Sequence, residues 1–309
     1  MEARGATEIQ HELLEKYVSK ELLDKVQICT SIPGKVPLDP NKINILWQKN
    51  SYDQGNLHSF FTDKTRFDEY DWYVFNSHWN YEKFRYFFSI PEDKCIVIKN
   101  GTDNFPKRKK YHKGDPIKII HHCTPWRGLN VLLLAMQMLK NENITLDVYS
   151  SCKVYGSEFA DGHEVAFKDI YKQAENLPNV NYIGHKTNEY ILENICNYDL
   201  FVYPSIFEET FCVSALEALA SGLHVITTNF GALPETCSEW PVYVNFTKNH
   251  ELLAESFAHA IDASAIYLHE EGMQKYLDEQ QKFFKRFYSW DRKGSEWTNF
   301  LTGAINVKR

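Results

Sequence analysis

Residues 198–235 read YDLFVYPSIFEETFCVSALEALASGLHVITTNFGALPE. Their apolar patterns predict a buried strand over 199–203, a helix over about 211–221 and a second buried strand over 223–227. A Pro-Ser turn and two adjacent acids separate the first strand from the helix. In a β-loop-α-β unit of a parallel sheet, that loop lies at the carboxyl edge, where open α/β sheets hold their ligands. We therefore expect the chemistry of this protein around Glu209.

Glu217 lies on the helix face that is predicted to be buried. It follows Val213 by four residues and precedes Ala220 by three, and residues at these spacings share one face of a helix. A carboxylate placed against a sheet is costly unless something binds it. Two kinds of partner fit: a pair of ligand hydroxyls, or backbone groups and a neighbouring basic side chain of the protein itself.

The spacing between the acids limits what they can do together. Glu209 precedes Glu217 by eight positions, with Glu208 beside it. One interpretation is that the two adjacent acids favour the positive end of the helix dipole, an effect of about 0.3–1 kcal/mol. A glycosidase would need two carboxylates about 5 Å apart for retention or about 6.5–9.5 Å for inversion. Because eight helical residues span about 12 Å, the spacing favours two ends of one elongated ligand over one scissile bond.

The segment from Glu209 to Glu217, set in YPSIFEETFCVSALEALASG and followed by GALPE, resembles the E-x7-E signature of retaining, family 4-type glycosyltransferases (glycosyl transferases group 1). This resemblance implies the GT-B fold, an α/β fold of two Rossmann-like domains that face a cleft. It also implies that Glu209 contacts hydroxyls of the donor sugar and that Glu217 holds the ribose of the nucleotide. Thr210, Phe211 and Cys212 fall on donor-binding positions, and Cys212 stands where many members have glycine.

A strand-turn-helix pattern marks a second part of the predicted donor site. A strand over 117–121 leads to Arg127 and Gly128 at the turn before a helix over about 129–140. A helix amino terminus beside a guanidinium makes a natural anion site. In the family, this turn is the basic loop that binds the diphosphate: Arg127 matches the usual lysine, and His122 takes the place of the usual arginine.

The loop after the predicted strand over 180–183 completes the donor-side residues. It contains Gly184, His185 and Lys186, and the resemblance places it against the nucleotide base. No G-x-G-x-x-G motif follows a strand at the start of a domain, which disfavours a dinucleotide-dependent dehydrogenase. No D-x-D pair indicates a required metal, so we predict no cofactor beyond the nucleotide sugar, although Mg²⁺ could accompany the diphosphate.

Composition excludes other classes. The 309 residues, 43% of them hydrophobic, suffice for two modest domains. The formal net charge of −7 disfavours a nucleic-acid binder. No apolar run approaches the roughly 20 residues of a spanning helix, and no signal-peptide pattern is present. Seven cysteines without a CxxC pair fit reduced thiols. We predict a cytoplasmic protein, soluble or in peripheral contact with a membrane.

The amino-terminal part predicts a small parallel sheet behind an amphipathic helix. The helical pattern covers the first 23 residues. Four runs rich in β-branched and aromatic residues predict strands over 26–30, 43–47, 72–76 and 95–98. An aromatic-rich segment over 60–88 could carry a ligand surface, but core packing in a small domain explains most of it.

The resemblance assigns three residues to the acceptor side: Gly5, Ala6 and His78. Gly5-Ala6-Thr7-Glu8 resembles the Gly-Gly-x-Glu loop that follows the first strand of the family's amino-terminal domain; a helix start with a capping glycine is the alternative. If the loop assignment holds, the sequence begins after the place of that strand, and the domain is expected to be shortened. His78 is either an acceptor-side base or a structural residue.

These assignments divide the chain into an acceptor-side domain over 1–108, a nucleotide-sugar-binding domain over 109–285 and a terminal helix over 286–309 that crosses back to the first domain. The basic run over 107–113 is interpreted as a solvated linker or as a contact for an anionic membrane.

The predicted function is transfer of a sugar from a nucleoside diphosphate to a hydroxyl acceptor. Two alternatives remain open: a phosphorylase-like GT-B enzyme, and a non-catalytic subunit that binds sugar or nucleotide.

Overall fold

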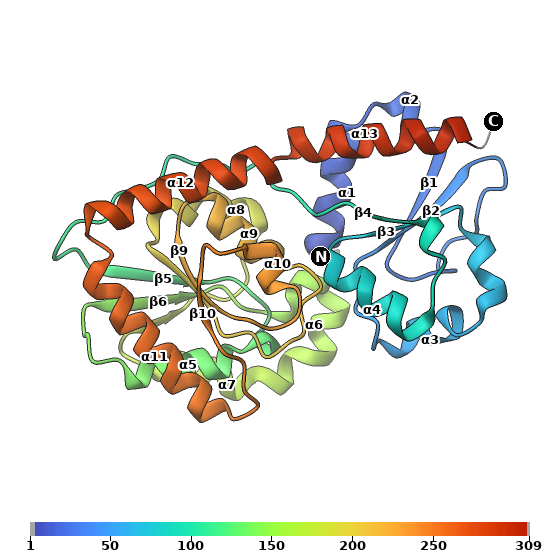
Figure 1. The fold of residues 1–309 in the computed structure, drawn as a ribbon. Coiled ribbons are helices and arrows are strands. Elements are labelled where there is room, and N and C mark those ends of the chain that lie inside the picture. The colour runs from blue at the N-terminus through green and yellow to red at the C-terminus, as the bar shows by residue number, and fades with distance from the viewer. Residues whose placement is uncertain (1–3, 308–309) are drawn as a thin grey trace. The chain divides into compact units, whose positions relative to one another are not determined.

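The computed structural model describes residues 4–307, which form two compact units (Figure 1). The central unit comprises the described residues up to Gly5, then Asn104–Glu208 and Val213–Arg286. The amino-terminal unit comprises Ala6–Asp103, Glu209–Cys212 and the described residues from Phe287 onward. Each unit is built on its own parallel sheet, as an α/β protein requires. Met1–Ala3, where the predicted first helix begins, lie outside the described residues.

Within residues 4–307 the amino-terminal unit has a four-stranded parallel sheet in the order β1-β2-β3-β4. Its strands are β1 Val26–Thr30, β2 Ile43–Gln48, β3 Trp72–Phe75 and β4 Cys95–Val97. All four strands predicted from the β-branched and aromatic runs are confirmed, with ends that differ by no more than one residue.

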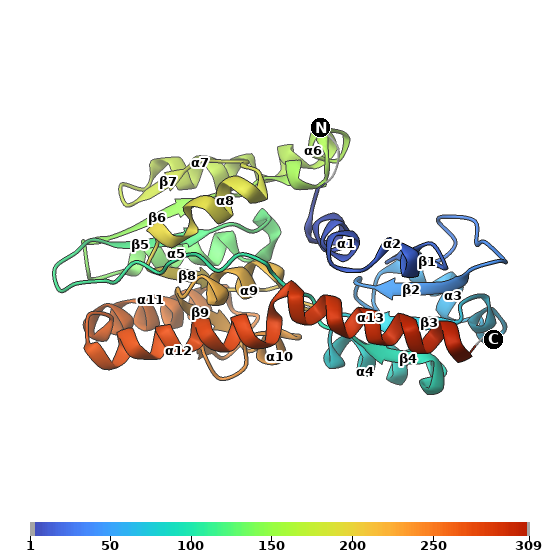
Figure 2. The same ribbon diagram turned by 90° about the horizontal axis from the view of Figure 1, so that it is seen from above.

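Alternate residues of this sheet pack against opposite helical layers, because successive side chains of a strand point to opposite faces. Ile45 and Trp47 pack on one face, in the cluster that contains Trp297. Leu46 packs on the other, in the cluster that contains Phe60. Figures 1 and 2 show α1 and α13 together on the first face, and Figure 1 shows α3 and α4 on the second. The helices of this unit are α1 Ala6–Tyr17, α2 Lys20–Leu23, α3 Gly55–Phe61, α4 His78–Phe88 and α13 Trp290–Val307.

The prediction of one continuous amphipathic helix over the first 23 residues is wrong. The structure has two helices, α1 and α2, because Ser19 between them takes an extended backbone conformation with φ −63° and ψ 140°. The aromatic-rich segment over 60–88 lies largely in the core, as predicted. Tyr86 and Phe87 are exceptions, with 81% and 52% of their surface exposed.

Within residues 4–307 the central unit has a six-stranded parallel sheet in the order β10-β9-β8-β5-β6-β7. The strands are β5 Ile117–His121, β6 Ile144–Val148, β7 Val180–Tyr182, β8 Leu200–Tyr203, β9 His224–Thr228 and β10 Val242–Val244. The chain starts at β5, adds β6 and β7 on one side, and then returns to add β8, β9 and β10 on the other. The strand order therefore reverses between β5 and β8, which is the switch point at which such sheets bind ligands.

Helices cover both faces of this sheet (Figure 1). The apolar stripe predicted for the helix after β5 is confirmed: Leu129, Leu132, Leu133 and Met136 are buried. The helices are α5 Leu129–Met138, α6 Ser157–His163, α7 Lys168–Asn176, α8 Asn188–Asn194, α9 Val213–Ala220, α10 Leu233–Cys237, α11 His250–Tyr267 and α12 Glu271–Tyr288. Over the described chain, none of the helices has the length and apolar character needed to span a bilayer.

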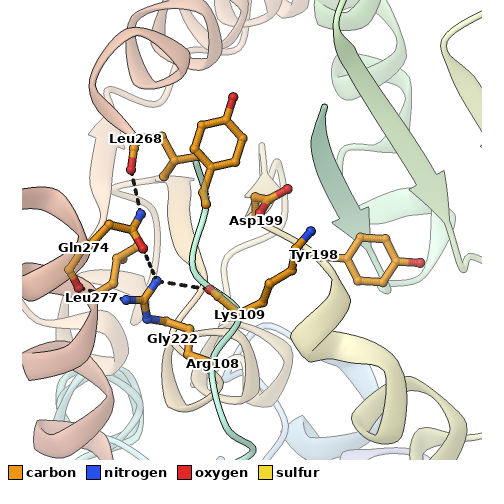
Figure 3. A pocket seen from close by; sticks show the side chains of 9 residues that line it. Arg108, Lys109, Tyr198, Asp199, Gly222, Leu268, Gln274 and Leu277 are labelled. Atoms are coloured by element: carbon orange, nitrogen blue, oxygen red, sulfur yellow. Dashed lines mark hydrogen bonds between the residues drawn. The ribbon is translucent and has the colours of Figure 1, made fainter. Parts of the chain in front are cut away.

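The solvated linker predicted for the basic run over 107–113 is wrong for Arg108. The Arg108 side chain is only 7% exposed, and it donates to the Asp278 carboxylate at 2.8 Å. It also donates to the Gln274 side-chain oxygen at 2.7 Å (Figure 3). A cavity of about 10 Å³ beside it has room for about one water molecule. Gly222 leaves the space that the arginine needs, since a Cβ there would stand 2.4 Å from its Cδ. Arg108 therefore binds this segment to α12.

Candidate functional site

Two loops meet at the carboxyl edge of the central sheet, on either side of the switch point. The loop after β5 contains the short 3₁₀ helix Pro125–Arg127 and leads through Gly128 into α5. The loop after β8 begins at Pro204. A ligand anion at this edge would therefore face both loops and the amino terminus of α5.

Gly128 lets these two loops touch. Its φ is +102°, and a Cβ on this residue would stand 2.0 Å from the Pro204 carbonyl oxygen. Real side chains do not accommodate such a contact, and L-residues avoid this φ. The glycine that the sequence placed at the strand-to-helix turn is thus required by both backbone conformation and packing.

Arg127 is held in place at this turn. Its Nε donates to the Thr124 hydroxyl at 3.1 Å, and its guanidinium carbon lies 4.4 Å from the centroid of the Phe207 ring. Thr124 belongs to the loop after β5, and Phe207 to the loop after β8. An arginine that is oriented in this way loses less conformational entropy on binding a phosphate.

His122 differs from Arg127 in charge. Burial, with a smaller contribution from the neighbouring His121, lowers the pKa of the His122 imidazole to about 3. The imidazole is therefore neutral near pH 7, and it offers a ligand hydrogen bonding only. Arg127 supplies the positive charge of this loop.

Glu217 is buried, as its helical spacing predicted, with 4% of its surface exposed. Its Oε1 accepts a hydrogen bond from the Asn188 side-chain amide at 3.2 Å. Asn188 is the first residue of α8, directly after the capping residue Thr187. Sequence reasoning missed Asn188, and the only signal that pointed to it was its place just after the loop predicted to face the base.

The charges of Arg127 and Glu217 both affect the pKa of the Cys123 thiol. Burial raises the pKa of the Cys123 thiol to about 11, a hydrogen bond from Ser214 and the charge of Arg127 oppose that rise, and the charge of Glu217 adds to it. The buried Cys123 thiol is thus affected by the charge of Arg127 and by that of Glu217. Both charges thus lie near the loop after β5 that contains Cys123.

His185 lies in the turn after β7. Burial lowers the pKa of its imidazole, and the charges of Lys153 and Lys186 lower it further. Gly184, just before it, has a φ of +74°, which favours glycine. This turn therefore places His185 and Lys186 at the carboxyl edge of the central sheet, and Lys153 belongs to the 3₁₀ helix Cys152–Tyr155 after β6.

Glu209 belongs to the amino-terminal unit, whereas Glu217 belongs to the central unit. Glu209 is 5% exposed. Because α9 begins only at Val213 and has no acid in its first turn, the interpretation of Glu208 and Glu209 as residues that favour the helix dipole is wrong. The dipole effect acts within the first turn.

The acceptor-side residues also lie at helix starts. Helix α1 begins at Ala6, directly after Gly5, so the helix-start alternative describes the local structure. His78 is the exposed first residue of α4, which Ser77 caps by accepting from the backbone N–H of Asn80. The acceptor roles of Gly5, Ala6 and His78 stay predictions.

Cys212 has the left-handed backbone conformation, with φ +72°, which explains why glycine is common at the matching family position.

We expect Cys212→Gly to change the free energy of unfolding by less than about 1 kcal/mol, because relief of about 1–2 kcal/mol of strain offsets the lost side chain. Cys212→Val should cost about 1–3 kcal/mol, since a β-branched residue is least tolerated there. Urea denaturation measures both, and equal losses for glycine and valine would contradict the strain argument.

The family described as Glycosyl transferases group 1 matches residues 101–280. An uncharacterized glycosyltransferase from Methanocaldococcus jannaschii is 26% identical over 239 residues, which cover 71% of this chain and 57% of that protein. The chain thus spans little more than half the length of this relative.

Solved structures confirm the fold. A glycosyltransferase from Rickettsia africae ESF-5 is 17% identical and matches 99% of this chain and 83% of its own, with a TM-score of 0.67. The Anabaena protein HepE, in complex with UDP and glucose, is 13% identical and matches 85% of this chain and 72% of its own, with a TM-score of 0.62. The predicted α/β GT-B fold with two Rossmann-like domains is therefore confirmed. Since the family match covers more than half of the 309 residues, the chain belongs to the glycosyl transferases group 1 family.

Proposed function

We propose that this protein is a retaining, family 4-type glycosyltransferase, which moves a sugar from a nucleoside diphosphate to a hydroxyl acceptor. The observation that carries the proposal is the arrangement at the switch point of the central sheet. Arg127 is oriented there by Thr124 and Phe207, and the buried Glu217 is held by Asn188. This arrangement suits a diphosphate and a ribose, respectively.

Each residue has a role in the proposed reaction. The bond between C1 of the sugar and the diphosphate breaks, and a bond from C1 to the acceptor oxygen forms on the same face. The acceptor proton leaves with the diphosphate. Arg127 and the amino terminus of α5 stabilise the charge that builds on the leaving diphosphate, a type of interaction that contributes about 3–4 kcal/mol. Glu209 orients the sugar, and Glu217 binds the ribose.

The proposal needs no cofactor besides the nucleotide sugar. All seven cysteines of the sequence lie in the described residues and are free thiols, which fits a reducing compartment. We therefore place the reaction in the cytoplasm.

Calorimetric titration with UDP, GDP and ADP tests the donor site. UDP is the first to try, because the HepE structure contains it. We expect micromolar binding of one nucleotide, weakened about 10- to 100-fold in Arg127→Ala, since hydrogen bonds to charged groups contribute about 1.5–3 kcal/mol.

Arg85→Ala is the control. Arg85 is an exposed arginine of α4 that pairs with Glu82 at 2.7 Å, and its loss should leave nucleotide affinity unchanged. If none of the three nucleotides binds the wild-type protein, the proposed donor site is wrong.

A further inference from the structure

The segment Glu209–Cys212 packs in the amino-terminal unit, although residues of the central unit precede and follow it in the sequence. It contains Glu209, the acid proposed to orient the donor sugar. What fixes this short segment therefore also fixes the position of that acid.

Thr210 takes part in three hydrogen bonds with the ends of two strands. Its hydroxyl donates to the backbone carbonyl of Lys49 at 2.8 Å and accepts from the Asn76 side-chain amide at 3.1 Å. Its backbone carbonyl accepts from the Ser77 hydroxyl at 2.6 Å. Lys49 follows β2, and Asn76 and Ser77 follow β3. The residue next to Glu209 is thus bound to the carboxyl edge of the amino-terminal sheet.

The groups that bind Thr210 are themselves buried and fixed. Asn76 is 2% exposed and Ser77 is fully buried. The Asn80 side-chain amide donates to Asn76 Oδ1 at 3.1 Å, which sets the orientation of the Asn76 amide. The backbone N–H of Asn80 donates to Ser77 Oγ at 2.9 Å, so the Ser77 hydroxyl is free to donate toward Thr210. A buried, mutually oriented set of this kind holds its geometry tightly.

Phe211, which follows Thr210 in the sequence, holds the same segment by apolar packing. Its side chain is 1% exposed, and its ring centroid lies 6.5 Å from that of Tyr288. Hydrogen bonds and apolar packing together restrain the segment that carries Glu209.

We propose that Asn76 and Ser77 are positioning residues, which align Glu209 with the donor sugar through Thr210. This inference rests on the proposed function. In the proposed function, Arg127 and Glu217 bind the nucleotide, whereas Glu209 orients the sugar. Loosening the anchor should lower turnover while leaving nucleotide affinity intact, because small misplacements of a reacting group are costly to rate.

Thr210→Val is the primary test, since valine has the shape of threonine but makes neither hydroxyl hydrogen bond. Ser77→Ala is the second; it removes the bond to the Thr210 carbonyl and also the acceptor that caps the backbone N–H of Asn80 at the start of α4. The readouts are kcat for hydrolysis of the nucleotide sugar whose nucleotide binds, and the calorimetric Kd of that nucleotide. We expect kcat to fall tenfold or more in each variant and Kd to stay within twofold. Thr210→Ser, which keeps the hydroxyl, should restore most of the rate.

Thr302→Val is a matched control. The Thr302 hydroxyl donates to the Thr298 carbonyl within α13, and its loss should leave kcat and Kd unchanged. The Ser77 variant also separates positioning from a direct contact between Thr210 and the donor, because a direct contact would leave Ser77→Ala fully active.

Full kcat in folded Thr210→Val and Ser77→Ala would overturn the positioning role, and so would equal losses of kcat and nucleotide affinity. If one variant fails to fold, the other decides. Failure of the proposed function has a different signature: the wild-type protein itself would bind no nucleotide.

Discussion

Replacing Glu209 by glutamine is expected to lower the rate of sugar transfer or donor hydrolysis about 10²- to 10³-fold, with nucleotide affinity within about twofold of wild type. Glu209 is 5% exposed, and in our proposal its carboxylate accepts hydrogen bonds from sugar hydroxyls. A charged acceptor gains about 1.5–3 kcal/mol per bond. Losing the charge from about two such bonds corresponds to about 3–4 kcal/mol of barrier, which gives the stated factor.

Steady-state kinetics and calorimetry of the same variant separate the two effects. Glu208→Gln is the matched control, because Glu208 is the adjacent acid and is less buried than Glu209. It should retain most of the activity. Glu217→Gln should show the reverse pattern, with nucleotide affinity reduced about tenfold as a charge-assisted bond to the ribose is weakened. Equal effects of the Glu209 and Glu217 variants on affinity and turnover would contradict the assigned roles.

The Gly128→Ala variant is expected to lose about 2–5 kcal/mol of stability in the central unit. A φ of +102° costs an alanine about 1–2 kcal/mol. The new Cβ would also stand 2.0 Å from the Pro204 carbonyl oxygen, and overpacking of this kind adds about 1–3 kcal/mol. Since the loops after β5 and β8 must separate to relieve the contact, nucleotide binding should weaken as well. Denaturant unfolding and calorimetry measure the two losses.

Gly272→Ala is the control for this substitution. Gly272 lies in α12, and nothing stands within 4 Å of a Cβ placed there. Alanine in a helix is favoured over glycine by about 0.5–1 kcal/mol, so this variant should be as stable as the wild type or more stable. If Gly128→Ala unfolds no more easily than Gly272→Ala, the close approach of the two loops is wrong.

Local sequence patterns were sufficient for the elements that carry the candidate site. The strand at 117–121 and the strand at 26–30 have the predicted ends. The burial of Glu217 followed from its spacing to Val213 and Ala220. These features depend on side chains a few residues apart on one strand or helix, and such neighbours are visible in the sequence.

Contacts between distant residues were not predicted from the sequence. Arg108 belongs to a run of basic residues typical of a solvated linker, yet its partner Asp278 is 170 positions away. Likewise, the break between α1 and α2 depends on the extended backbone of Ser19, which the apolar stripe does not reveal.

The sequence alone determined the α/β class, most of the strands, and the acids and glycine at the strand-to-helix turns, because these follow from local periodicity and backbone preference. The edge strand β10 was not predicted. The tertiary structure alone decided which groups hold those residues. Asn188 meets Glu217 across 29 positions and Asn76 meets Thr210 across 134. Side-chain partners at such separations are set by how the sheet edges and helices pack, and a single sequence carries no local signal for that packing.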